Sequence, residues 1–323
     1  MIARRTFLKC AAAFVAFSLA TPVFAQSKGP IPVVATFSIL GDMVKQIGGK
    51  HVAVTTLVGP NGDAHVYQPT PADARAVSKA KLLVVNGLGF EGWLHRLIDA
   101  SDFKGKRVVA TQGIEPIAHE DEDHDKHADS DDHDKHADHE SHDKHDHGAF
   151  DPHAWQSLRN AIFYVDNITA GLAQANPERA TMFYRNRANY VEKVRALDKE
   201  IRQIISAVPE ASRKIVTSHD AFQYFGRDYG LTFLAPQGFS TESEASAKDV
   251  ARLIKRIRKD KIRAVFVENI TDSRLLEQIA RETSASIGGT LYPGALSGPD
   301  GPAPVYLDMM RHNAMILAQA LSS

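Results

Sequence analysis

The histidines of this chain are the residues whose number and spacing could support chemistry. Nine of the 15 His lie within residues 119–147, together with thirteen Asp or Glu and almost no apolar side chain. Neutral imidazole is a good ligand for zinc, copper and nickel, and carboxylates attract cations in general. The tract therefore predicts weak, auxiliary metal binding through His119, His124, His127, His133, His136, His139, His142, His145 and His147.

The composition of this tract also predicts its physical state. The unit His-Asp-Lys-His recurs, beginning at His124, His133 and His142. Such a segment cannot bury enough apolar surface to offset the entropy of ordering, so we expect residues 119–147 to form a disordered loop when no metal is bound. The loop could scavenge ions, buffer them or pass them to a tighter site nearby. The alternative is a solvated charged loop without a role.

Six further histidines lie outside the tract, namely His51, His65, His95, His153, His219 and His312. Three of them stand where a strand ends or a helix begins, which is where α/β domains place ligand-binding groups. His65 follows a turn at residues 59–62, His153 precedes a long helical stretch, and His219 follows an apolar strand. Any one of them could be an ordinary hydrogen-bonded histidine. In a chain with a metal-collecting tract, the three together predict one site of three imidazoles.

The elements that must position these side chains follow an α/β pattern. Short apolar runs predict strands and amphipathic stretches predict helices, and their alternation implies parallel sheets. In the first half, strands are expected at 31–37, 51–58 and 81–86, and helices at 39–47 and 71–80. In the second half, strands are expected at 214–217 and 262–267, and helices at 221–229, 246–259, 275–283 and 305–321.

A long helical region separates the two halves. It extends from Trp155 to Ile205 with a predicted break at Asn176-Pro177, because Pro does not continue a helix. The fold class is therefore α/β, with two lobes joined by a long rigid backbone helix. The domain boundaries that follow are an N-terminal lobe at 26–176, a linking helix at 177–206 and a C-terminal lobe at 207–323.

Residues 1–25 have the features of an export signal. Arg4 and Arg5 precede an apolar run that starts at Cys10, and small residues allow cleavage after Ala25. The segment around the two arginines resembles the twin-arginine signal, and the ordinary secretory route remains open. We expect the mature protein to be free in the periplasm. Cys10 is the only cysteine, so His and carboxylate must hold any metal in the mature chain.

Five motifs resemble those of the periplasmic zinc- and manganese-binding proteins of bacterial ABC metal transporters, the ZnuA-like cluster A-I family. They are GDAH at 62–65, GLGFEGW at 87–93, DPHAW at 151–155, TSHDAFQYF at 217–225 and QGFSTESE at 237–244. The resemblance covers nearly all of the mature chain. It implies two α/β lobes joined by one rigid helix, with metal bound in the cleft between the lobes by His65, His153 and His219.

The resemblance also implies a function, which is capture of a metal ion outside the cytoplasm and its delivery to the ABC transporter permease in the inner membrane. Zn²⁺ is favoured as the cargo, since three neutral imidazoles suit it better than Mn²⁺ and since related zinc binders carry a His-rich loop. A manganese-binding homologue is the alternative. We expect a monomer, with a periplasmic zinc chaperone as a further candidate partner. The formal net charge of −1 offers no basic field for nucleic acid.

One position departs from the family pattern. The family usually supplies a fourth ligand from an acidic residue near the C-terminus, and Gly294 occupies the corresponding position here. The fourth place is then filled by water, by a carboxylate from elsewhere such as the acidic tract, or by nothing. Three His and a water would still make a tetrahedral zinc site.

Two other functions compete with transport. A zinc-dependent hydrolase would also use three His and an open position, but the chain has no His-Glu-x-x-His motif. A metal-buffering or adhesion protein could use the tract and never meet a transporter. For any of these, only neutral imidazole binds the ion, so we expect affinity to fall below about pH 6.5.

Overall fold

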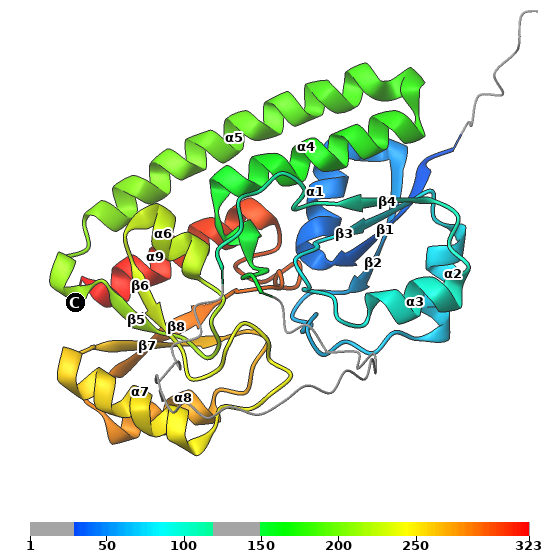
Figure 1. Ribbon diagram of the computed structural model, residues 1–323. Coiled ribbons are helices and arrows are strands. Elements are labelled where there is room, and N and C mark those ends of the chain that lie inside the picture. Colours follow the sequence, from blue (N-terminus) through cyan, green and yellow to red (C-terminus); the bar gives the residue numbers. More distant parts are fainter. Residues whose placement is uncertain (1–28, 119–148, 323) are drawn as a thin grey trace, which may run out of the picture.

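The computed structural model describes residues 29–118 and 149–322, so the predicted signal peptide and the predicted disordered tract lie outside the described residues. Within these ranges the chain forms two four-stranded parallel sheets, with strand orders β2-β1-β3-β4 and β6-β5-β7-β8. Each sheet belongs to one lobe, and a long helix runs alongside both lobes (Figure 1). The predicted α/β fold of two lobes joined by a long helix is confirmed.

The first lobe is built around strands that are buried on both faces. Its elements are β1 (Ile31–Phe37), α1 (Ser38–Gly48), β2 (Val52–Val58), α2 (Pro71–Lys79), β3 (Leu82–Val85), α3 (Leu94–Ser101) and β4 (Lys106–Val109). The central strands β1 and β3 are almost fully buried, as expected for a parallel sheet covered by helices. The apolar run that makes each of them recognisable in the sequence is thus required by its position in the sheet.

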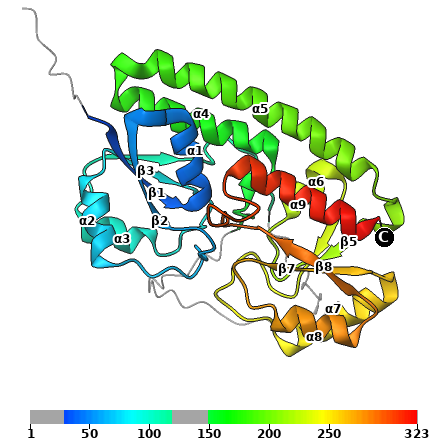
Figure 2. The same ribbon diagram turned by 180° about the vertical axis from the view of Figure 1, so that it is seen from behind.

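The second lobe repeats this arrangement with shorter strands. It contains β5 (Lys214–Val216), α6 (Gln223–Tyr229), β6 (Thr232–Leu234), α7 (Ala247–Asp260), β7 (Ala264–Glu268), α8 (Arg274–Glu282), β8 (Ser286–Leu291) and α9 (Tyr306–Leu321). Helices α7 and α8 cover one face through a small core of their own. The C-terminal helix α9 packs against β8 of this lobe and also lies beside the long helix α5 (Figure 2).

Two helices make the connection between the lobes. α4 (Leu158–Ala175) and α5 (Ala180–Ser206) lie side by side, and a short 3₁₀ turn at Pro177–Arg179 separates them, so the predicted break is confirmed. α5 has 27 residues and therefore extends roughly 40 Å at 1.5 Å per residue. Its buried positions recur at helical spacing and contact α1, α4 and α9. Packing on three neighbours makes this helix a rigid support for the two lobes.

The pattern of apolar residues did not predict four of the observed elements. These are α3, β4, β6 and β8, which are short, carry charged or exposed residues, or contain Gly288 and Gly289 within the strand. The long helical region also begins later than expected, because a 3₁₀ turn at Ala154–Gln156 precedes α4. No helix among the described residues is long and apolar enough to span a membrane.

Candidate metal centre

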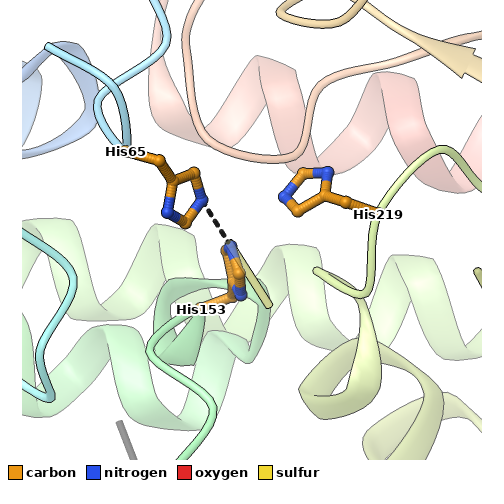
Figure 3. A group of neighbouring side chains, drawn as sticks. All are labelled: His65, His153 and His219. Carbon is orange, nitrogen blue, oxygen red and sulfur yellow. Dashed lines mark hydrogen bonds between the residues drawn. The ribbon is translucent and has the colours of Figure 1, made fainter. Parts of the chain in front are cut away.

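The three histidines singled out from the sequence converge at one point between the lobes (Figure 3). One ligand nitrogen from each of His65, His153 and His219 lies within 4.8 Å of the other two. The Nε2 atoms of His65 and His153 are 3.2 Å apart. In residues 29–118 and 149–322, no other group of three His, Cys, Asp or Glu is arranged to hold an ion in this way.

His65 is presented by the loop between β2 and α2. The turn at residues 59–62 reverses the chain with Asn61 at φ 54°, a left-handed conformation that Asn tolerates. The carboxylate of Asp63 then accepts the backbone N–H of His65 at 2.9 Å. The imidazole rests against the edge of Phe90, with ring centroids 4.7 Å apart. Backbone and ring are therefore both fixed before any ion arrives.

His153 lies just before the helical region, and one neighbouring carboxylate orients it. Asp151 Oδ1 accepts the backbone N–H of His153 at 2.9 Å and its ring Nδ1–H at 2.8 Å. Both side chains are fully buried. Because Nδ1 carries the proton, the lone pair of Nε2 is directed at the other two histidines.

His219 is held in the same way by a residue whose role the sequence did not suggest. Glu268 Oε2 accepts from Nδ1 of His219 at 2.6 Å, while Oε1 accepts the backbone N–H groups of Ser218 and His219 at 3.1 and 3.2 Å. The Nε2 atom of His219 is buried and has no hydrogen-bond partner. A buried nitrogen without a partner needs an explanation, and a metal ion supplies one. The signal that could have indicated Glu268 is its place at the end of β7, beside the end of β5.

The electrostatic environment differs between the three rings. Burial and then the neighbouring imidazoles lower the pKa of His65 well below its usual value of 6.5. The pKa of His153 falls for the same two reasons. Burial is the largest single influence on His219 and acts to lower its pKa, but the hydrogen bond and charge of Glu268, together with the charges of Asp63 and Asp220, outweigh burial and raise the net pKa above 6.5. His65 and His153 are thus neutral at pH 7, whereas a proton competes with a metal ion for the imidazole of His219.

The position of Gly294 in the fold matters for the fourth ligand. A Cβ added there would lie 3.7 Å from Trp155 Cζ2 and 3.9 Å from Ile270 Cδ1, so the position faces apolar side chains. The carboxylates of Asp151 and Glu268 accept hydrogen bonds from Nδ1 of His153 and of His219, on the side of each ring away from Nε2. Within the described part of the chain the ligand cluster contains only the three His. The arrangement fits a borderline metal ion held by neutral nitrogen.

A cleft of about 1000 Å³ opens beside the cluster and is lined by both lobes. His65, Tyr67 and Trp93 line it from the first lobe, and Phe239 lines it from the second. Ala118 and Phe150 pair in an antiparallel bridge, and Phe150 also lines the cleft. The described residues on either side of the 119–148 gap are therefore neighbours at the mouth of this cleft.

Of the remaining described histidines, none joins the cluster. The Nε2 atom of His312 lies 3.1 Å from the carbonyl oxygen of Thr290. His51 lies at the end of a 3₁₀ turn and His95 is an exposed residue of α3. The structure thus brings together the three histidines that the sequence singled out, and their role as metal ligands stays a prediction.

Two parallel-sheet lobes on a helical support, with buried ligands contributed by both lobes, define a solute-binding protein of the metal-binding type. The chain belongs to the ZnuA family, described as zinc-uptake complex component A, periplasmic, whose model matches residues 33–320. It is therefore a metal-binding component of an ABC transporter and not an enzyme, which excludes the hydrolase considered above.

Named relatives support this family and differ in metal. The chain is 31% identical to the iron-binding protein YfeA of Yersinia pestis, over 97% of this chain and 96% of the relative. It is 32% identical to the manganese-binding lipoprotein MntA of Bacillus subtilis, over 90% of each. The family itself is described as periplasmic, and the chain is accordingly an exported protein.

Solved structures agree with the fold. An Mn-bound mutant of a periplasmic metal-binding protein from Candidatus Liberibacter asiaticus superposes with a TM-score of 0.76 at 34% identity, covering 90% of this chain and 98% of that one. The periplasmic zinc-binding protein TroA from Treponema pallidum gives a TM-score of 0.79 at 27% identity, covering 91% of this chain and 100% of that one. The relatives thus establish a metal-binding function, while their names include iron, manganese and zinc.

Proposed function

We propose that this protein captures Zn²⁺ in the periplasm and delivers it to the permease of an ABC-type importer. The observation that carries the proposal is the ligand set, in which three buried imidazoles converge and no carboxylate oxygen joins them among the described residues. Zinc accepts four ligands and favours neutral nitrogen, whereas Mn²⁺ prefers more ligands and oxygen donors. Capture in the cleft depends on ligands from both lobes, so the ion stabilises the closed arrangement of the lobes.

A second candidate is a manganese- or iron-binding function. The names of YfeA, MntA and the Mn-bound bacterial structure favour it. Under this alternative, oxygen ligands from water or from outside the described residues must complete the coordination of the larger ion. The two candidates therefore differ in a measurable quantity, which is the ratio of the affinities for zinc and for manganese.

Several features accompany the proposal. Residues 1–25 act as the cleaved signal peptide, and residues 119–147 act as a weak ion-collecting loop near the cleft. The lobes are divided at 26–176 and 207–323, with 177–206 as the linking helix. The protein acts as a monomer, and a periplasmic zinc chaperone is a candidate donor.

Competition with a chelator of known affinity tests the choice of metal. We expect the purified metal-free protein to bind zinc at least about 100-fold more tightly than manganese, because the ligand set lacks oxygen donors. His153→Ala should reduce zinc affinity by a similar factor, since it removes one of the three imidazoles and its hydrogen bond to Asp151. His95→Ala, at an exposed position of α3, is the matched control. Equal affinities for the two metals would contradict the zinc proposal and favour the second candidate.

A further inference from the structure

Side-chain hydrogen bonds tie the loop that carries His65 to the second lobe. Asn269 Nδ2 donates to Asn61 Oδ1 at 3.0 Å, and Thr241 Oγ1 donates to Asp63 Oδ2 at 2.6 Å. The partners are 208 and 178 residues apart in the sequence. Both bonds therefore connect the two lobes directly at the rim of the metal site.

The two ties differ in strength. The bond between Asn269 and Asn61 joins neutral amides and is exposed to solvent. The bond from Thr241 reaches a carboxylate, is partly buried and is the shorter of the two. Hydrogen bonds to charged acceptors are roughly twice as strong as neutral ones, and burial strengthens them further. The Asp63–Thr241 bond is thus the stronger of these two side-chain connections between the lobes.

The two carboxylate oxygens of Asp63 link the backbone of His65 to the side chain of Thr241. Oδ1 accepts the backbone N–H of His65 at 2.9 Å, while Oδ2 accepts the hydroxyl of Thr241. Any movement of the Thr241 loop relative to the first lobe is therefore transmitted to the backbone of a metal ligand. Asp151 and Glu268 orient the other two histidines through ring Nδ1, whereas the carboxylate of Asp63 accepts the backbone N–H of His65 and also a side chain of the second lobe.

We propose that Asp63 and Thr241 are positioning residues for metal capture, which hold His65 in the geometry that the other two imidazoles require. The inference rests on the proposed zinc function. Its physical basis is preorganisation, because a ligand that is already held in place loses less entropy when the ion binds. Thr241 does not touch the ion, so it affects capture only through Asp63.

A merely structural role for Thr241 would predict a different result from a positioning role. If the hydroxyl only stabilised its own loop, its removal would have the same effect whether or not Asp63 is present. If it acts through Asp63, its removal has no further effect once Asp63 is gone. A double-mutant cycle separates these cases.

The experiment measures zinc affinity by chelator competition for the full chain, Thr241→Val, Asp63→Ala and the double variant. We expect Thr241→Val to weaken zinc binding by about tenfold, which corresponds to the loss of one hydrogen bond to a charged group. In the Asp63→Ala background, Thr241→Val should cause no further loss. Thr241→Ser, which retains the hydroxyl, should restore affinity to within about twofold of the natural chain.

Two controls keep the result interpretable. Ser243→Ala alters an exposed residue of the same loop and should leave zinc affinity unchanged. Thermal unfolding of the metal-free variants shows whether each is folded, and Thr241→Val preserves the shape of a half-buried side chain.

Unchanged affinity in Thr241→Val, or an equal loss in both backgrounds, would overturn the positioning role. Failure of the zinc function itself looks different, since it would show as weak zinc binding by the natural chain or as no effect of His153→Ala. The two failures are therefore distinguishable in the same set of measurements.

Discussion

Each of the three imidazoles directs a nitrogen at the site, but the group behind each ring differs. A carboxylate accepts from the Nδ1 of His153 and of His219, whereas the carboxylate beside His65 accepts its backbone N–H. The contacts to Nδ1 fix the tautomer and orientation of His153 and His219, and changing such a partner in a metal site typically costs about 10–100-fold in affinity. The three rings also differ in their tendency to be protonated, because the pKa is lowered for His65 and His153 and raised for His219.

This difference in protonation changes the expected dependence of zinc affinity on pH. A proton on His219 must leave before zinc binds, and Glu268 raises the pKa of His219. Affinity should therefore start to fall above pH 6.5 as pH decreases, earlier than ordinary histidine ligands would predict. His65 and His153 contribute to the decline only at lower pH, since their pKa values are lowered.

Glu268→Gln tests this assignment. Without the Glu268 charge, burial is opposed only by the smaller effects of Asp63 and Asp220, so the pKa of His219 falls and the decline of zinc affinity should move to lower pH. At neutral pH the variant should bind zinc roughly 10–100-fold more weakly, as is typical when the partner of a ligating His is changed. Zinc dissociation constants measured between pH 5.5 and 8 provide the test. A pH profile that keeps the midpoint of the natural chain would show that another group controls the decline.

At the scale of elements, the packing of α4 on the first sheet places His153. Gly171 allows this approach, because a Cβ added there would lie 2.5 Å from Val108 Cγ2 on β4 and 3.7 Å from Leu82 Cδ2 on β3. The helix can thus lie close to the strands, with its N-terminal end directed at the cleft. Glycine has a low helix propensity, so its presence in the middle of α4 is explained by the close packing of Gly171 on the sheet.

Gly171→Ala is expected to lower the free energy of unfolding. In an exposed helix the change would stabilise by roughly 0.5–1 kcal/mol, but overpacking a core contact typically costs about 1–3 kcal/mol. We therefore expect a net loss, measured by urea denaturation of the metal-free protein. Gly298→Ala is the matched control, because nothing lies within 4 Å of a Cβ at that position. A gain in stability for Gly171→Ala would mean that α4 moves away from β4 without cost.

The elements that sequence analysis recovered share one property. β1, β3 and β7 present apolar runs because both faces of these strands are covered, and α5 repeats its apolar positions because it packs on three helices. β4 begins with exposed Lys106 and Arg107 at the edge of its sheet, and β8 contains two glycines. The signal of these two edge strands is too weak to be recognised, whereas β2, which is also an edge strand, has seven uncharged residues, five of them apolar, and was predicted.

At the scale of the whole molecule, the site depends on both lobes, and none of its three histidines comes from the His-rich tract. His65 and His153 precede the helices α4 and α5 in the chain, and His219 follows them. The bridge between Ala118 and Phe150 closes the base of the segment that carries the tract. The tight site and the tract are therefore separable in principle.

A chain without residues 119–147 is expected to bind one zinc ion with the affinity of the full chain and to lose the more weakly bound ions. The reason is that all three ligands lie in the described residues, outside the tract. Metal content after equilibrium dialysis at a series of free zinc concentrations measures both classes of ion. A loss of tight-site affinity of about tenfold or more would instead indicate that the tract supplies the fourth ligand.

Much of this protein was determined by local sequence. Glycine and proline mark the turns, apolar runs mark the covered strands, and positions at the ends of elements predict His65, His153 and His219 as ligands. These features are readable because each depends on neighbours close in the chain or on burial on all sides.

Only the tertiary structure decided what surrounds the ligands. Glu268 reaches His219 from 49 residues away, and Thr241 reaches Asp63 from 178 residues away. Whether an acidic residue orients a ring, raises the pKa of that ring or simply faces solvent depends on which strands lie side by side and how far each side chain is from water. Those relations arise when the chain folds, and no local pattern of residues encodes them.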